Sequence, residues 1–149
     1  MVLNCQSLVL KIDTVMDIVK SKKVDICFLN ETWFKKAKYS TTQQIEERGY
    51  KSFHSNVFGH GKGTAILLKN NLKYKKVELN LAFTSFDAVV LHLTNATCLV
   101  CLYQYYKWGS AFEILLAEFS SFLSDLTMSC DSFLICGDIN VHYNDPLES

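Results

Sequence analysis

Phe133-Leu-Ile-Cys-Gly-Asp-Ile-Asn140, near the end of the sequence, is a short apolar run that passes through a glycine into a carboxylate and an amide. An earlier stretch, Asp25-Ile-Cys-Phe-Leu-Asn-Glu31-Thr-Trp33, has the same character. Each apolar run predicts a buried strand, and ligands of layered α/β folds bind at the carboxyl ends of strands. We therefore take Glu31, Asp138 and Asn140 as candidate site residues, with oxygen donors suited to Mg²⁺ or Mn²⁺ beside a phosphate. Taken singly, such residues often only satisfy turns and helix ends.

The rest of the sequence predicts an α/β protein with a largely antiparallel middle. An amphipathic helix is expected over Ser7–Lys20, where Leu8, Ile12, Val15 and Val19 form a stripe. A capping box, Ser110-Ala-Phe-Glu113, predicts a second helix. Its apolar face is expected to contain Phe112, Leu115, Leu116, Phe119, Leu123 and Leu126. Strands are predicted over Val24–Asn30, Tyr50–Phe53, Thr64–Lys69, Lys75–Leu81, Phe86–Leu93, Thr97–Tyr103 and Phe133–Gly137. Between the first two of these, Phe34–Thr42 is expected to be a loop and Gln43–Arg48 a helical turn that ends at Gly49.

The length of 149 residues and the 49% apolar content indicate one folded domain over residues 1–149 and exclude disorder. No targeting segment is recognisable. The longest uncharged stretch, Ala88–Tyr106, contains several polar residues and a turn-like Thr94-Asn95-Ala96. It predicts a hairpin and no membrane span.

Charge is divided unevenly along the chain. Residues 1–76 contain 14 Lys and Arg against 6 Asp and Glu, whereas residues 77–149 contain one Lys against 9 acids. An anionic partner on the basic half and a cation site on the acidic half would explain this division. Two oppositely charged, solvated faces would explain it equally well, and charge alone favours that interpretation.

The six cysteines are expected to be free thiols in the apolar interior, which indicates a reducing, intracellular compartment. Cys98-x-x-Cys101 has the spacing of a zinc-binding pair but falls inside a predicted strand. An odd spacing on a strand directs the two thiols to opposite faces, so this pair does not predict zinc.

Four motifs in order carry a resemblance to a known family. They are Leu3-Asn4-Cys5-Gln6-Ser7-Leu8, Leu29-Asn30-Glu31-Thr32-Trp33, Gly61-Lys62-Gly63-Thr64-Ala65-Ile66-Leu67 and Ile135-Cys136-Gly137-Asp138-Ile139-Asn140-Val141-His142. Together they resemble the endonuclease/exonuclease/phosphatase family, and most closely the apurinic-type endonuclease domain of non-LTR (LINE-type) retrotransposons. The resemblance implies a two-sheet α/β sandwich that corresponds to the amino-terminal part of that domain and is incomplete at its carboxy terminus.

The resemblance also implies roles for individual residues. Glu31 matches the metal-binding glutamate and Asn4 the first-strand asparagine that helps to hold metal and phosphate. Asp138 matches the aspartate that aligns or deprotonates the attacking water, Asn140 its partner asparagine, and Tyr103 the tyrosine that contacts the scissile phosphate. The implied activity is Mg²⁺- or Mn²⁺-dependent phosphodiester hydrolysis, with DNA as the expected partner and no membrane.

Basic residues of the first half are candidates for contacts with nucleic-acid phosphates. The foremost are Lys35, Lys36 and Lys62, and Lys38 and Lys69 are further candidates. For a retroelement endonuclease we also expect a nuclear location and a reverse-transcriptase region in a longer parent protein.

Two departures from the family pattern bear on activity. Gln104-Tyr-Tyr follows Tyr103 where the family has Arg-Pro-Pro, and the family's closing Ser-Asp-His motif has no counterpart among the 149 residues. We therefore expect these residues alone to be inactive. The alternatives are a non-catalytic fragment or binding module, or a phosphodiesterase of the same family that acts on a lipid or RNA. A nucleotide-binding loop at Gly59–Thr64 is disfavoured, because Gly63 separates the lysine from the threonine and a strand is predicted next.

Overall fold

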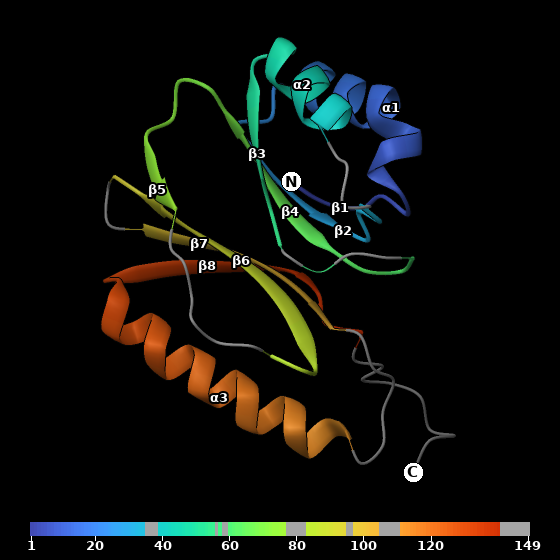
Figure 1. Ribbon diagram of the computed structural model, residues 1–149. Coiled ribbons are helices and arrows are strands. Elements are labelled where there is room, and N and C mark those ends of the chain that lie inside the picture. Colours follow the sequence, from blue (N-terminus) through green and yellow to red (C-terminus); the bar gives the residue numbers. More distant parts are fainter. Residues whose placement is uncertain are drawn as a thin grey trace.

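The computed structural model describes residues 1–34, 39–55, 57, 60–76, 83–94, 97–104 and 111–140. Two four-stranded sheets lie face to face in this part of the chain (Figure 1). Helices α1 (Leu8–Ser21) and α2 (Tyr39–Glu47) cover the outer face of the first sheet, and α3 (Ala111–Ser129) covers the outer face of the second. This layering confirms the α/β sandwich that the sequence predicts.

The first sheet has the strand order β1-β2-β4-β3. Its strands are β1 (Val2–Asn4), β2 (Ile26–Asn30), β3 (Tyr50–His54) and β4 (Thr64–Lys69). The pair β1–β2 is parallel, whereas β4 runs antiparallel to both β2 and β3. The parallel pair places the carboxyl ends of β1 and β2 next to each other, which matters for the candidate site.

The two helices over the first sheet differ in how well the sequence predicts them. The predicted stripe of α1 is buried as expected, because its members recur every three or four residues. The predicted loop over Phe34–Thr42 is wrong at its end, since α2 begins at Tyr39. Only Thr41 and Ile45 of α2 are buried, four residues apart, and this short contact is too small to give a clear periodic pattern.

The second sheet has the order β5-β6-β7-β8. Its strands are β5 (Tyr74–Lys76), β6 (Phe86–Leu93), β7 (Thr97–Gln104) and β8 (Ser132–Asp138). The pairs β5–β6 and β6–β7 are antiparallel, and β7–β8 is parallel. Residues 77–81 of the predicted strand Lys75–Leu81 and residue 110 of the capping box lie outside the described residues.

The apolar face of α3 is shifted from the predicted one. Leu115, Phe122 and Leu126 are buried against the second sheet, whereas Leu116 is 52% exposed and was wrongly placed on the face. Spacings of seven and four residues keep these three side chains in one line along the helix, and Leu116 lies about 100° away from Leu115. Thr84 and Ser85, just before β6, hold the same helix through the Glu118 carboxylate, which accepts bonds from both backbone amides and both hydroxyls.

Three apolar layers fill the sandwich. One lies between α1, α2 and the first sheet, one between the sheets, and one between the second sheet and α3. All six cysteines are free thiols. Cys98 belongs to the layer under α3 and Cys101 to the layer between the sheets, which confirms that their odd spacing directs them to opposite faces. Within the described ranges, no helix has the length and apolar character that a membrane crossing requires.

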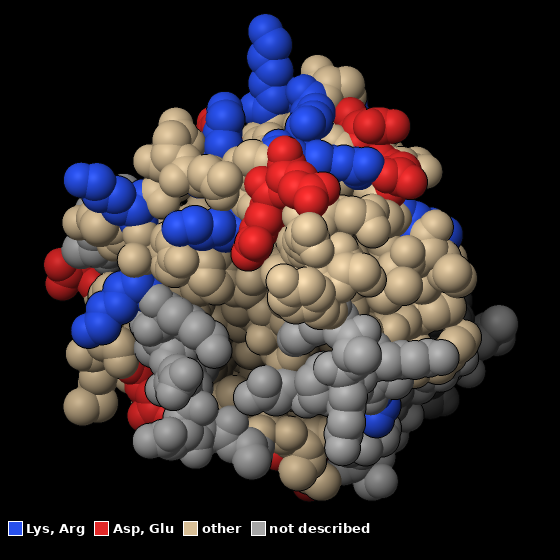
Figure 2. Space-filling view, turned by 45° about the horizontal axis from the view of Figure 1, so that its top comes forward, with Lys and Arg blue, Asp and Glu red and all other residues tan. Residues whose placement is uncertain are grey.

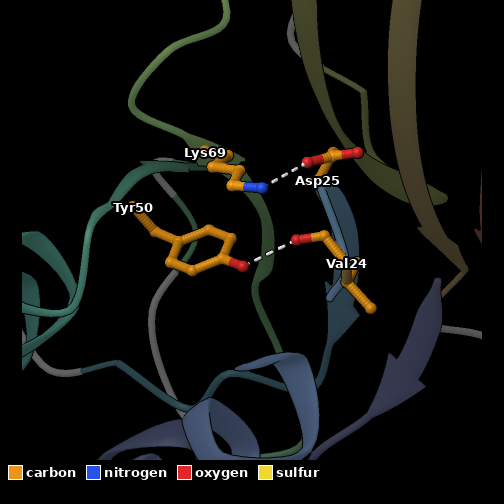
Figure 3. A network of polar contacts seen from close by, with 4 residues as sticks. All are labelled: Val24, Asp25, Tyr50 and Lys69. Atoms are coloured by element: carbon orange, nitrogen blue, oxygen red, sulfur yellow. Dashed lines mark hydrogen bonds and ion pairs between the residues drawn. The ribbon is translucent and has the colours of Figure 1, made fainter. Parts of the chain in front are cut away.

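A polar network ties the first sheet together at the end where β2 begins and β4 finishes (Figure 3). Tyr50 donates its hydroxyl to the Val24 carbonyl at 2.7 Å, and the Lys69 ammonium lies 2.9 Å from the Asp25 carboxylate. The hydrogen bond and charge of Asp25 raise the pKa of Lys69. Asp25 and Lys69 thus form an ion pair at the end of the sheet opposite the candidate site, and a phosphate contact by Lys69 stays a prediction.

Candidate active site

The carboxyl ends of both parallel strand pairs meet at one rim of the sandwich. Asn4 and Asn30 end β1 and β2 and are partners in register. Tyr103 and Asp138 are likewise partners near the ends of β7 and β8. Because the two sheets face each other, this rim collects polar side chains that are far apart in sequence.

Backbone bonds from the start of α1 hold the turn that carries Glu31. The Ser7 amide donates to the Glu31 carbonyl at 2.9 Å, and the Leu8 amide donates to the Thr32 carbonyl at 3.0 Å. Glu31 itself has a φ of 55°, a left-handed conformation that costs a non-glycine residue energy. The surrounding bonds therefore fix the position of the carboxylate.

The glycine motif holds the other side of the same turn. Thr32 donates its amide to the Gly63 carbonyl at 3.1 Å, and Trp33 donates to the Lys62 carbonyl at 3.0 Å. A Cβ on Gly63 would lie 2.5 Å from the Thr32 hydroxyl, and Gly63 has a φ of +93°. This close approach explains why the turn needs glycine there. The strand β4 begins directly after it, as predicted, which argues against a nucleotide-binding loop.

Glu31 joins residues from both sheets. Its Oε1 accepts a hydrogen bond from Asn4 Nδ2 at 2.8 Å and another from the Tyr103 hydroxyl at 3.2 Å. Asn4 comes from the first sheet and Tyr103, 72 residues from Glu31, from the second. Three of the predicted site residues are therefore in direct contact.

Asp138 and Asn140 complete the rim beside Tyr103. Asp138 Oδ1 accepts the Asn140 amide at 3.0 Å, and Asn140 Nδ2 donates to the Gln104 carbonyl at 2.8 Å. Asn140 also has a left-handed backbone, with a φ of 46°. Gly137 permits this arrangement, because a Cβ there would lie 1.7 Å from the Leu102 carbonyl oxygen.

The Tyr103 hydroxyl lies among acidic neighbours. Burial raises its pKa, the Glu31 charge and hydrogen bond raise it further, and a hydrogen bond with Asn140 partly opposes this. The charge of Asp138 adds to the increase. Tyr103 is therefore a neutral hydrogen-bond donor over the physiological pH range.

Two buried polar contacts between the sheets were missed by sequence reasoning. Asn30, fully buried, donates its side-chain amide to the Leu102 carbonyl at 2.9 Å. Asp87 Oδ2 accepts from the Thr64 amide at 3.1 Å and from its hydroxyl at 3.3 Å. An aspartate inside the apolar run of β6 was the available signal, because a buried carboxylate needs partners. These contacts fix one sheet against the other directly beneath the rim.

Of the predicted nucleic-acid-binding lysines, Lys62 is exposed and lies beside the Glu31 turn. Lys35, Lys36 and Lys38 lie outside the described residues. Figure 2 shows Lys and Arg side chains interspersed with acidic ones on the side of the molecule where α1 and α2 lie. The ring of Trp33 lies against that of His60 with 3.9 Å between centroids and a tilt of 30°, which adds an aromatic pair to the rim.

Two facing sheets with carboxylates, amides and a tyrosine at the ends of their parallel strands are the architecture of the nuclease and phosphatase fold. The model of the Endonuclease/Exonuclease/phosphatase family matches residues 1–147. The chain belongs to this family, whose members are generally dependent on a divalent metal. No curated protein sequence matches it significantly.

Solved structures show the same fold at low sequence identity. A 3'-5' exonuclease from Neisseria meningitidis matches with a TM-score of 0.72 and 15% identity over 94% of this chain. An AP endonuclease from Archaeoglobus fulgidus matches with 0.68 and 16% over 98%. The endonuclease domain of TRAS1, a telomere-specific non-LTR retrotransposon, matches with 0.61 and 18% over 95%. The chain covers 57%, 58% and 60% of these three structures, respectively.

The donor set at the rim fits a hard divalent cation. Glu31 and Asp138 supply carboxylate oxygens and Asn4 an amide oxygen, and neither a thiol nor an imidazole belongs to this set. Carboxylate and amide oxygens are the ligands that Mg²⁺ and Mn²⁺ prefer. Glu31 and Asp138 are half-buried and Asn4 is exposed, so the oxygens remain within reach of an ion and a substrate.

Proposed function

We propose that these residues carry the phosphodiester-hydrolysing site of a divalent-metal-dependent DNA endonuclease of the retroelement type. The observation that supports this proposal most strongly is that the Glu31 carboxylate accepts hydrogen bonds from Asn4 on the first sheet and from Tyr103 on the second. Asp138 and Asn140 extend the same cluster. Glu31 keeps a left-handed backbone, which is unfavourable for a residue other than Gly, Asn or Asp, at the position that brings its carboxylate to both partners.

In this proposal, Glu31 and Asn4 hold Mg²⁺ or Mn²⁺. The bound ion would supply positive charge against the negative charge that develops on the phosphoryl oxygens. Asp138 accepts a proton from the attacking water, which needs a carboxylate with a free lone pair. Asn140 orients Asp138 through its backbone amide and offers its side chain to a phosphate oxygen.

Tyr103 contributes as a neutral donor. Its raised pKa keeps the proton on the hydroxyl, so it can donate to a phosphoryl oxygen without adding negative charge. In the free protein this hydroxyl donates to Glu31. Binding of an ion by Glu31 would weaken that bond and release the donor toward the substrate.

DNA is the proposed substrate for two reasons. Lys62 lies exposed beside the Glu31 turn, where it can contact a phosphate next to the cleaved one. One structural neighbour is a retrotransposon endonuclease domain, and another is an AP endonuclease. Lipid or RNA phosphodiesters use the same hydrolytic chemistry, and they form separate arms of the test.

We further propose that residues 1–149 alone bind the metal but do not cleave DNA. The printed sequence contains no Ser-Asp-His motif, and the chain covers 57% to 60% of its structural neighbours. Catalytic residues that act as a unit lose most of their activity when one is absent. A histidine from a continuing chain would complete the set.

The first experiment measures Mn²⁺ binding to the 149-residue chain by electron paramagnetic resonance. We expect binding to the wild-type chain, at least about 100-fold weaker binding to Glu31→Gln, and no change in Glu46→Gln, which alters an exposed carboxylate on α2. Equal binding by the wild type and Glu31→Gln would contradict the assignment of the metal site.

The second experiment measures nicking of supercoiled plasmid with Mg²⁺ and with EDTA. The 149-residue chain should not nick above a Glu31→Ala control, and robust nicking that Glu31→Ala abolishes would disprove the inactivity. A chain extended along its reading frame through a Ser-Asp-His motif should nick DNA with Mg²⁺ only. If the extended chain hydrolyses RNA or lipid phosphodiesters but not DNA, the proposed substrate is replaced. If the extended chain has none of these three activities, a binding module is favoured.

A further inference from the structure

Three potential metal ligands meet at the end of the second sheet that lies away from the candidate active site. His92 on β6 is the register partner of Cys98 on β7, so both side chains leave the sheet on the same face. That face packs against α3, and Cys130 directly follows the last turn of this helix. One nitrogen of His92 and the two sulfurs lie within 4.8 Å of one another.

These three side chains place polar atoms inside an otherwise apolar layer. Cys98 is fully buried in the apolar layer beneath α3. Its thiol is hydrogen-bonded to that of Cys130, which also donates to the Leu126 carbonyl at 3.1 Å. His92 Nε2 is buried and has no hydrogen-bond partner among the described residues. Since burial of an unpaired polar atom costs free energy, His92 lacks the partner that a bound ion would supply.

We propose that His92, Cys98 and Cys130 bind a Zn²⁺ ion that links the end of α3 to the β6–β7 hairpin. Two sulfurs and an imidazole nitrogen form a soft donor set, which selects zinc over Mg²⁺. Ligand atoms of tetrahedral zinc lie roughly 3.5–3.8 Å apart, so the three ligand atoms need to approach one another by at most about 1.3 Å. A water or another donor takes the fourth position.

This zinc site is separate from the hydrolytic one. Cys98 and Tyr103 are five residues apart on β7, which corresponds to about 17 Å along an extended strand. The oxygen donors of Glu31 and Asp138 therefore cannot share an ion with Cys98. The proposed zinc has a structural role and does not rest on the proposed function.

Zinc binding has a defined proton balance. Each thiol that becomes a thiolate ligand releases one proton, whereas neutral His92 binds through a lone pair and releases none. Binding therefore strengthens as the pH rises. The competing chemistry is oxidation of Cys98 and Cys130 to a disulfide, in which two thiols lose two hydrogens to an oxidant and His92 takes no part.

The test uses the reduced, metal-free 149-residue chain and Co²⁺ as a spectroscopic probe. We expect one thiolate-bound Co²⁺ per chain, counted from its thiolate-to-cobalt charge-transfer band and the visible bands of tetrahedral cobalt, and displacement of this ion by Zn²⁺. Cys130→Ser and His92→Asn should each weaken binding at least about tenfold. The matched control Cys136→Ser, a half-buried cysteine on β8, and Glu31→Gln should both retain it.

A measurement on the wild-type chain keeps the test independent of variant folding. Zn²⁺ should raise the Tm of the wild-type chain, and EDTA should reverse the increase. Absence of the charge-transfer band, or a band that survives both Cys130→Ser and His92→Asn, would overturn the proposal. Isolation of the untreated chain as a Cys98–Cys130 disulfide without zinc would overturn it as well. Loss of Mn²⁺ binding in Glu31→Gln with Co²⁺ binding intact would show that the two sites fail separately.

Discussion

The two ends of β7 use different chemistry. At the carboxyl end, Tyr103 lies among carboxylates and amides, held by hydrogen bonds between the sheets and by left-handed backbone at Glu31 and Asn140. At the amino end, Cys98 lies beneath α3 in an apolar layer, beside a thiol and an imidazole. The oxygen donors at the carboxyl end include Glu31, whose backbone is left-handed, whereas the sulfur and nitrogen donors at the amino end lie in a packed apolar layer. In the two proposals, this one strand therefore separates a hydrolytic metal site from a structural zinc site.

The largest expected effect comes from removing the close backbone approach at the carboxyl end. Gly137→Ala places a Cβ against the Leu102 carbonyl and disrupts the parallel pairing of β7 and β8. We expect a loss of more than about 4 kcal/mol in the free energy of unfolding, or failure to fold. Gly61→Ala is the matched control. It meets no atom within 4 Å but keeps a φ of +68°, and should cost about 1 kcal/mol. Urea denaturation followed by circular dichroism measures both, and equal losses would refute the steric explanation.

The second prediction concerns the contact between the sheets. Asn30→Ala leaves the buried Leu102 carbonyl without its side-chain donor and opens a small cavity. We expect the free energy of unfolding to fall by about 2–3 kcal/mol. Exposed Asn71→Ala should change it by less than about 0.5 kcal/mol. A near-neutral Asn30→Ala in urea denaturation would mean that the sheets are held by apolar packing alone.

The third prediction tests how α3 is fixed near the start of β6. Burial would raise the pKa of Glu118, but hydrogen bonds from Ser85 and Thr84 outweigh it and lower the pKa from 4.5 to about 2. A lowered pKa in the folded state stabilises the protein above pH 4.5, and this contribution is lost as the pH falls toward 2. We expect Glu118→Gln to cost about 1–2 kcal/mol at pH 7, after allowance for solvent screening.

The measurement for Glu118 is the free energy of unfolding as a function of pH. The wild-type chain should lose stability between pH 4.5 and 2 more steeply than Glu118→Gln. Exposed Asp17→Asn on α1 should leave the wild-type profile unchanged. Parallel profiles for the wild type and Glu118→Gln would show that these bonds do not couple folding to protonation.

The smallest effect is expected for the Lys62→Gln variant, and it concerns the salt dependence of DNA binding by the 149-residue chain. If Lys62 contacts one phosphate, the slope of log affinity against log salt should decrease in magnitude by about 0.9. Lys20→Gln, at the far end of α1, should leave the slope unchanged. Fluorescence anisotropy at several salt concentrations measures both. An affinity that does not vary with salt would favour the interpretation of the charged halves as solvated faces.

Most of the fold was predictable because its strands are short apolar runs bounded by polar residues. Thr64–Lys69 and Phe86–Leu93 coincide with β4 and β6. The helix α2 was partly missed because a single apolar residue, Ile45, anchors it. On α3 the prediction placed Leu116 on the apolar face and left out the buried Phe122, since a leucine-rich sequence has several equally apolar stripes and only the register against the sheet decides between them.

The candidate site was predictable to the extent that its residues follow strands directly. Glu31 directly follows β2 and Asp138 ends β8, the first motif contains Asn4, and the family resemblance implies Tyr103. Contacts across the sandwich were not predictable, because partners such as Asn30 and Leu102 are 72 residues apart and their pairing depends on how the sheets face each other. For the same reason the sequence linked Cys98 with Cys101, whereas the structure places it with His92 and Cys130.

The contact between the Trp33 and His60 rings gives the rim an optical signal. The sequence contains two tryptophans, Trp33 and Trp108, so a Trp108→Phe variant restricts the indole emission to the turn that carries Glu31. An imidazole in contact with an indole ring quenches its fluorescence. Any ion or nucleic acid that moves the turn or displaces the His60 ring therefore changes the brightness of Trp33, and binding at the site can be followed in real time without an attached dye.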